Sequence, residues 1–298
     1  MAGIQPSPAT VSAPTVNGPT ASPFARLTPF RIRLSLDDAT TVRVEATGAT
    51  GRVTTTMPRP LLPHSLDERD SDSWSVARRT GLALYRVAFP PGVVALIGEH
   101  RATQSSPVSI LLDLASPELV DLPWELVRDP AVDQFLGLSR ESPISRSVDG
   151  LAHTMPTPQD RQLSVVVSGS RDEDDALRQT LDVLPHVKIM TSNSAEPAGN
   201  VDVIHVESFG IDDGTSMSAP VVIVPGTAGD AVRAATRPGV TAGIAVPVDL
   251  PQETRSLFLE GLYRGLSSGL PIDQAFTDAR RAVASARSLA NLEWANRR

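Results

Sequence analysis

The alternation of apolar and polar residues becomes regular at Phe30. From Phe30 to Leu36, apolar side chains alternate with Arg31, Arg33 and Ser35, which predicts a half-buried strand. A second alternating run over residues 42–46 and a third near Val53 follow after short polar turns. The beginning of the chain is therefore expected to be antiparallel in character.

A helix and another strand complete this part of the pattern. Residues 74–88 carry apolar side chains at helical spacing, and we expect Pro90 and Pro91 to end that helix. Residues 108–114 alternate again and predict a strand. Together these elements predict a smaller α+β portion over residues 30–148.

The remainder of the chain has an α/β pattern. The run LSVVVSG at 163–169 is nearly continuously apolar, as in a strand that is covered on both faces. Ser170 and Glu173 form a capping-box spacing that predicts the start of a helix. Further strands are expected at 187–192, 201–207, 219–226 and 240–248, before two closing helices. We therefore predict an α/β domain at 162–298 with a mostly parallel sheet.

Two connections in this domain lack a helical pattern. They are residues 193–200 and 208–218, although parallel strands are normally joined by crossover helices. Both missing crossovers would fall on the same face of the sheet. We expect that face, near Ile204 and Val222, to bind a partner protein or a second copy of the chain. The N-terminal portion or a short helix near 230–236 could cover it instead.

Residues 1–29 form a Pro/Ala/Ser/Thr-rich segment that cannot bury much apolar surface, so we expect a disordered tail. A peptide ligand for a partner is the alternative. Residues 149–161 are expected to be a linker.

Deleting residues 1–25 is expected to leave the fold intact. Thermal melting of the truncated protein tests this. A fall in the midpoint of more than about 5 °C, roughly 1–2 kcal/mol at this size, would show that the segment is packed.

Composition narrows the possible functions. The net charge of the 298 residues is −7, so no general attraction to nucleic acid or to anionic membranes is expected. The absence of cysteine excludes disulfides and thiol nucleophiles. We find neither a signal-peptide pattern nor an apolar run that is long enough to span a membrane, and we expect a cytoplasmic protein.

Metal and cofactor sites have little support in the sequence. The spacing of the histidines does not match a metal site, and we expect no metal and no cofactor. These histidines are His64, His100, His153, His186 and His205. The segments 168–170 and 226–230 read as turns from a strand into a helix. At 226–230 a ligand held by backbone N–H groups remains an alternative to a plain turn.

Two long blocks resemble one known family. They are DLPWELVRDPAVDQFLGLSRESPISR at 121–146 and GLYRGLSSGLPIDQAFTDARRAVA at 261–284. Both are similar to segments of CHAT domains, which are caspase-like domains with the fold of clan CD cysteine peptidases. The resemblance covers about residues 30–296. It implies a caspase-like α/β fold with reduced crossover helices.

The resemblance also implies that the catalytic residues have been lost. Active members use the second histidine of a His-x-x-Gly-His-Gly motif and a cysteine that ends the fourth strand. The segment VIHVESFG aligns His205 with the first histidine and Phe209 with the catalytic one. The segment VVIVPGTAGD aligns Thr227 with the cysteine, or Gly226 if the register slips by one. Phenylalanine carries no proton, and threonine without a base is a poor nucleophile.

We therefore expect a pseudoprotease and not an enzyme. His205 is predicted to be structural, either in the core or hydrogen-bonded. Family context implies an interaction or scaffold subunit in a bacterial signalling or defence assembly. The alternative is an active hydrolase or peptidase that uses Thr227 or a serine with His205. It requires the imidazole and a hydroxyl to lie within hydrogen-bond reach in an open cleft.

Overall fold

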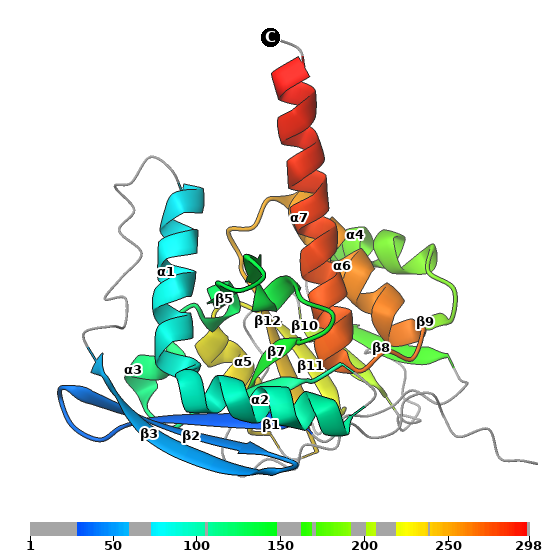
Figure 1. Ribbon diagram of the computed structural model, residues 1–298. Helices are drawn as coiled ribbons and strands as arrows, with labels where there is room; N and C mark the ends of the chain where they lie inside the picture. Colours follow the sequence, from blue (N-terminus) through cyan, green and yellow to red (C-terminus); the bar gives the residue numbers. More distant parts are fainter. Residues whose placement is uncertain are drawn as a thin grey trace, which may run out of the picture.

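The computed structural model of the chain describes residues 29–59, 73–104, 107–147, 162–168, 171–191, 201–206, 219–237 and 239–296. It contains one five-stranded sheet in each half of the chain and a small two-stranded hairpin (Figure 1). Residues 1–28 and the expected linker at 149–161 lie outside the described residues.

The N-terminal sheet is mixed and not purely antiparallel. Its order is β3-β2-β1-β4-β7, with β1 antiparallel to β2 and parallel to β4. The predicted alternation in β1 is confirmed, because Phe30, Ile32 and Leu34 are fully buried between exposed arginines. The strands are β1 (Phe30–Leu36), β2 (Thr41–Gly48), β3 (Gly51–Pro58), β4 (Ile110–Leu114) and β7 (Ile144–Ser147).

The prediction that the prolines only end a helix is incomplete. The expected helix is present as α1 (Ser73–Ala88), but a second helix, α2 (Pro91–Thr103), begins at once. Pro90 is its N-cap and Pro91 its first residue, where the missing N–H of proline costs nothing. Among the described helices none alone is long and apolar enough to cross a membrane, and only α1 and α2 together meet that test, bent by 82°.

Short elements connect β4 to β7 and build the wall against which α1 packs. A carbon atom added to Gly81 of α1 would lie 2.0 Å from the carbonyl oxygen of Leu126, so only glycine allows this approach. The elements are α3 (Pro117–Val120), η2 (Trp124–Leu126), β5 (Arg128–Asp129), β6 (Gln134–Phe135) and η3 (Leu136–Leu138).

The C-terminal sheet is parallel throughout, as predicted. Its order is β12-β11-β10-β8-β9, which places the first strand of this half between the second and the third. The strands are β8 (Leu163–Ser168), β9 (Val187–Thr191), β10 (Val203–Val206), β11 (Val221–Pro225) and β12 (Ala242–Val246).

Helices cover both faces of this sheet. The helices α4 (Arg171–Asp182), α6 (Gln252–Ser267) and α7 (Ile272–Asn296) share an apolar cluster with one face. The helix α5 (Ala228–Ala235) packs on the other face, over β11 and β12. In Figure 1, α7 stands between α6 and the elements of the N-terminal half.

The expectation of an open docking face at Ile204 and Val222 is wrong. Their side chains are only 8% and 3% exposed. Both belong to an apolar cluster that includes Ala234 of α5 and Val240, so the short helix predicted near 230–236 contributes to the cover. A partner could not contact these two side chains without displacing part of the chain.

Candidate functional site

His205 lies on β10 and is buried against α6. Its Nδ1 shares a hydrogen bond of 2.8 Å with the hydroxyl of Tyr263, and the two rings lie nearly parallel at 6.1 Å. His205 is 3% exposed and Tyr263 is fully buried. The imidazole is therefore within reach of a hydroxyl, but neither group faces an open cleft.

This buried pair is expected to stabilise the fold. Changing Tyr263 to phenylalanine removes the hydroxyl and leaves a polar ring nitrogen without that partner. We expect a loss of about 1–2 kcal/mol in the free energy of unfolding, measured in urea. The change Tyr85→Phe is the control, because it removes a tyrosine hydroxyl whose hydrogen bond, to Asp129, lies in a half-buried position. An equal loss in both variants would contradict a special contribution from the pair.

Thr227 lies in the turn between β11 and α5 and is exposed. Its backbone N–H and its hydroxyl both donate to Oδ2 of Asp230, at 2.7 and 2.8 Å. Asp230 in turn donates its backbone N–H to the carbonyl of Thr227. This is the arrangement of a helix N-terminus, with the aspartate at the third helical position. The hydrogen bonds from Thr227, first from its N–H, lower the pKa of Asp230.

The two aligned positions do not form a nucleophile–base pair. His205 is in register with Ile223, four residues before Thr227 on the neighbouring strand. The imidazole binds Tyr263 on the α6 face, and the threonine hydroxyl binds Asp230 at the start of α5. Gly226 has φ 126° and donates its N–H to Val246. Phe209 lies outside the described residues.

A partly buried charge cluster joins the two halves of the chain. Arg146 of β7 donates to both carboxylate oxygens of Glu125, at 2.9 and 2.6 Å, and to the carbonyl of Leu122. Arg280 of α7 approaches the same carboxylate at 3.7 Å. Its guanidinium also lies 4.1 Å from the ring centre of Phe276. One carboxylate thus serves two arginines, one from each half.

The ionisation of this cluster follows from its surroundings. Burial by itself would raise the pKa of Glu125, but Arg146 and then Arg280 outweigh that effect and hold the pKa below its usual value. Burial lowers the pKa of Arg280 to about 10, against the opposing effect of Glu125. Arg280 therefore stays charged at neutral pH, and the cluster carries one negative and two positive charges.

Two further contacts attach α7 to the N-terminal half. Arg140 donates to both oxygens of Asp278, at 2.6 and 3.0 Å, and Arg281 donates to the carbonyl of Leu138 at 3.1 Å. These residues belong to the two blocks that were compared with CHAT domains. The blocks thus meet in space, which their separation along the chain did not reveal.

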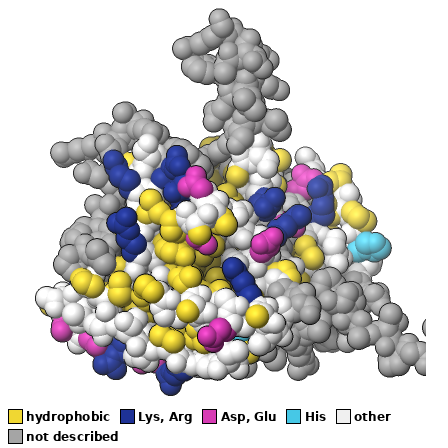
Figure 2. Space-filling model, in the orientation of Figure 1, with side chains coloured by type: hydrophobic (Ala, Val, Ile, Leu, Met, Phe, Trp, Pro, Cys, Tyr) yellow, Lys and Arg dark blue, Asp and Glu magenta, His cyan; other side chains and the backbone are white. Residues whose placement is uncertain are grey.

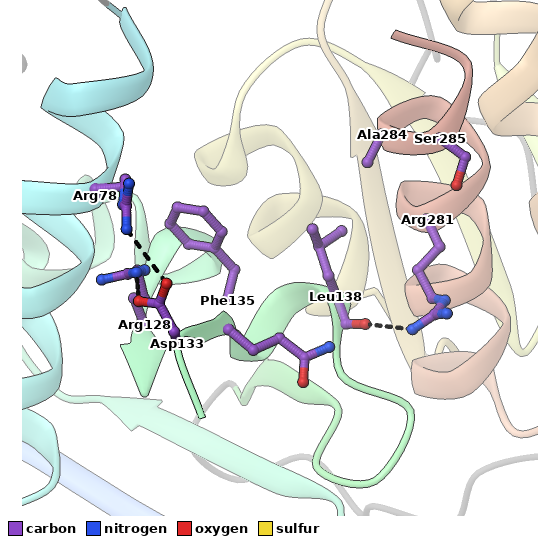
Figure 3. A pocket seen from close by; sticks show the side chains of 9 residues that line it. Arg78, Arg128, Asp133, Phe135, Leu138, Arg281, Ala284 and Ser285 are labelled. Atoms are coloured by element: carbon purple, nitrogen blue, oxygen red, sulfur yellow. Dashed lines mark hydrogen bonds and ion pairs between the residues drawn. The ribbon is translucent and has the colours of Figure 1, made fainter. Parts of the chain in front are cut away.

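A pocket of about 400 Å³ opens beside this junction, between α1, the β5–β6 hairpin and α7 (Figure 3). Arg78 and Arg128 both pair with Asp133 at one wall. Arg281 and Ser285 lie at the opposite wall, with Phe135 and Leu138 between the two. Within the described parts of the chain, no group of three or more histidine or acidic residues could hold a metal ion.

This pocket could not be predicted from the sequence. Its arginines lie on three elements that are far apart along the chain and belong to no shared motif. Arg128 and the hairpin residues that follow it fall within the block at 121–146 and Arg281 falls within the block at 261–284, whereas Arg78 lies outside both blocks.

Comparisons with known proteins found no match to any family model, curated protein or solved structure.

Proposed function

We propose that this chain is a catalytically inactive, CHAT-like protein with a caspase-like domain at 162–298. In this proposal it acts as an interaction or scaffold subunit in a cytoplasmic assembly, of the kind used in bacterial signalling or defence. The resemblance of the two sequence blocks motivates the family. The parallel sheet, with its first strand between the second and the third, is compatible with that fold.

The observation that carries the proposal is the engagement of both aligned groups in the scaffold. A hydroxyl nucleophile needs a base that can take its proton. The hydroxyl of Thr227 donates to the carboxylate of Asp230, the third residue of α5. Hydrogen bonds from Thr227, first from its backbone N–H, lower the pKa of this carboxylate, which makes it a poor base for taking the hydroxyl proton. The imidazole of His205 is buried with Tyr263. These contacts support the proposal that neither group takes part in catalysis.

The alternative, a hydrolase that uses Thr227 or a serine with His205, would need the imidazole to reach an exposed hydroxyl. That requires β10 to move away from α6 or the ring to leave its buried position. In the described structure the imidazole shares a hydrogen bond with the hydroxyl of Tyr263, which is fully buried.

Covalent labelling tests whether any hydroxyl is activated. The full chain is incubated with a fluorophosphonate at neutral pH, and its intact mass is measured, with trypsin as the positive control. We expect the mass to remain unchanged, because an unactivated hydroxyl does not react. A single adduct on Thr227 or on a serine that disappears in a His205→Gln variant would contradict the proposal.

A further inference from the structure

The pocket beside α7 is lined by a net positive charge, and the proposed function does not explain this charge. Its titratable lining residues are Arg78, Arg128, Arg281 and Asp133, which gives three positive charges and one negative charge, a net of +2. The chain as a whole carries −7. Charges further apart than about 8 Å are largely screened at physiological ionic strength, so the local excess decides which ligands the pocket attracts.

One wall already holds a carboxylate between two arginines. Asp133 in the hairpin turn pairs with Arg128 and, at 3.3 Å, with Arg78. The side chain of Arg128 is 7% exposed, whereas that of Asp133 is 65% exposed. A buried guanidinium is thus neutralised by an acid that lies mostly in solvent. Arginine binds carboxylates through paired N–H groups, so an external carboxylate can join or replace Asp133 here.

The opposite wall carries a second positive charge, and the space between is apolar. Arg281 is exposed and its described contact is with the carbonyl of Leu138, which leaves its charge without a described acidic partner. Phe135 and Leu138 separate it from the first wall (Figure 3). In Figure 2, apolar side chains gather in the middle of this face, with basic side chains on both sides.

This layout selects the chemistry of the ligand. Two positive walls on either side of an apolar floor match an extended segment that has acidic side chains on either side of an apolar one. A single compact anion would use only one wall. The volume of about 400 Å³ lies within the usual range of ligand sites.

We propose that this pocket binds a short acidic peptide segment of a partner protein. One acidic side chain of the segment meets Arg78 and Arg128, another meets Arg281, and an apolar side chain between them packs on Phe135 and Leu138. The proposal rests on the interaction role proposed above and names the chemistry of the partner. Asp133 acts as a resident competitor for the first wall.

Fluorescence polarisation with peptide pools tests the proposal. One pool of labelled hexapeptides carries Asp or Glu on both sides of Leu or Phe, and the matched pool carries Asn or Gln at the acidic positions. We expect the full chain at low salt to bind members of the acidic pool only. The change Arg281→Gln should weaken that binding about tenfold, the usual scale of one charged hydrogen bond.

Matched variants separate this pocket from general charge effects. The change Arg264→Gln alters the net charge equally on the exposed surface of α6 and should leave affinity within about twofold. The change Asp133→Asn should tighten binding, whereas Asp249→Asn, at an exposed acid outside the pocket lining, should not. If Arg281→Gln does not fold, Ser285→Glu places a negative charge on the same wall and should weaken binding.

Three outcomes would overturn the proposal. The first is equal binding of both pools, and the second is equal effects of Arg281→Gln and Arg264→Gln on affinity. The third is that inorganic phosphate or AMP displaces every peptide and binds more tightly than the peptides do. The last would make this a small-anion site. If the pocket does not bind acidic peptides, the proposal that the chain is catalytically inactive is unaffected. If a bound peptide is hydrolysed, the proposed inactivity is contradicted but the assignment of the pocket as a peptide site is not.

Discussion

Replacing Trp124 with alanine is expected to lower the free energy of unfolding by about 3–5 kcal/mol, the usual cost of removing a large buried aromatic side chain. Trp124 is 1% exposed and belongs to the core of the N-terminal half. Its indole N–H donates to the carbonyl of Leu119 at 2.6 Å. The variant therefore leaves a cavity and also removes a hydrogen bond from a backbone carbonyl. Urea denaturation followed by circular dichroism measures the change.

The change Trp124→Phe is the matched control. It keeps an aromatic ring in the core but removes the N–H, so we expect a loss of only about 1–2 kcal/mol. If the alanine variant costs no more than the phenylalanine variant, Trp124 does not anchor this core. A role in binding would then become the better explanation of its place in the sequence block.

The second large effect is expected at Glu125. The change Glu125→Gln leaves Arg146 and Arg280 close together without the carboxylate that neutralises them. Breaking a buried ion pair from one side costs about 3–5 kcal/mol. Because the side chain of Glu125 is 34% exposed, water screens the pair and we expect about 2 kcal/mol, between the costs for a buried and an exposed pair. The exposed pair of Glu260 and Arg264 provides the control, where Glu260→Gln should cost about 0.5 kcal/mol or less.

The same carboxylate predicts a pH dependence. Because the folded state holds the pKa of Glu125 below its ordinary value of 4.5, its stabilisation is complete above about pH 4.5. It is lost as the pH falls through the lower, folded-state pKa. The difference in stability between the wild-type protein and Glu125→Gln should therefore shrink with acidification below about pH 4.5. A difference that stays constant down to pH 2 would exclude this ionisation as its source.

Much of the fold could be predicted because strands buried on one face or on both faces have characteristic patterns of apolar residues. The alternation from Phe30 to Leu36 and the continuous apolar run of β8 both mark strands of the expected kind. The helix α2 was harder to predict from the sequence. Proline both ends one helix and begins the next, and the buried residues of α2 include a histidine, His100, whose ring accepts from the N–H of Ala49.

The cover of the second sheet face was misjudged for a related reason. The apolar residues of β10 and β11 indicated burial on both sides, which is correct for Ile204 and Val222. The sequence does not show whether such cover comes from the same chain. The pocket was invisible for a different reason, because Arg78, Arg128 and Arg281 are brought together only by tertiary packing.

Peptide turnover tests most directly whether this chain is an interaction subunit or a hydrolase. A fluorogenic peptide library is incubated at neutral pH with the wild-type protein, with Thr227→Ala and with His205→Gln, and an active cysteine peptidase serves as the positive control. We expect all three proteins to match the buffer background, because Thr227 is bound by Asp230 and His205 is buried with Tyr263. Turnover by the wild-type protein that falls by about 10²-fold or more in either variant would contradict the proposed function.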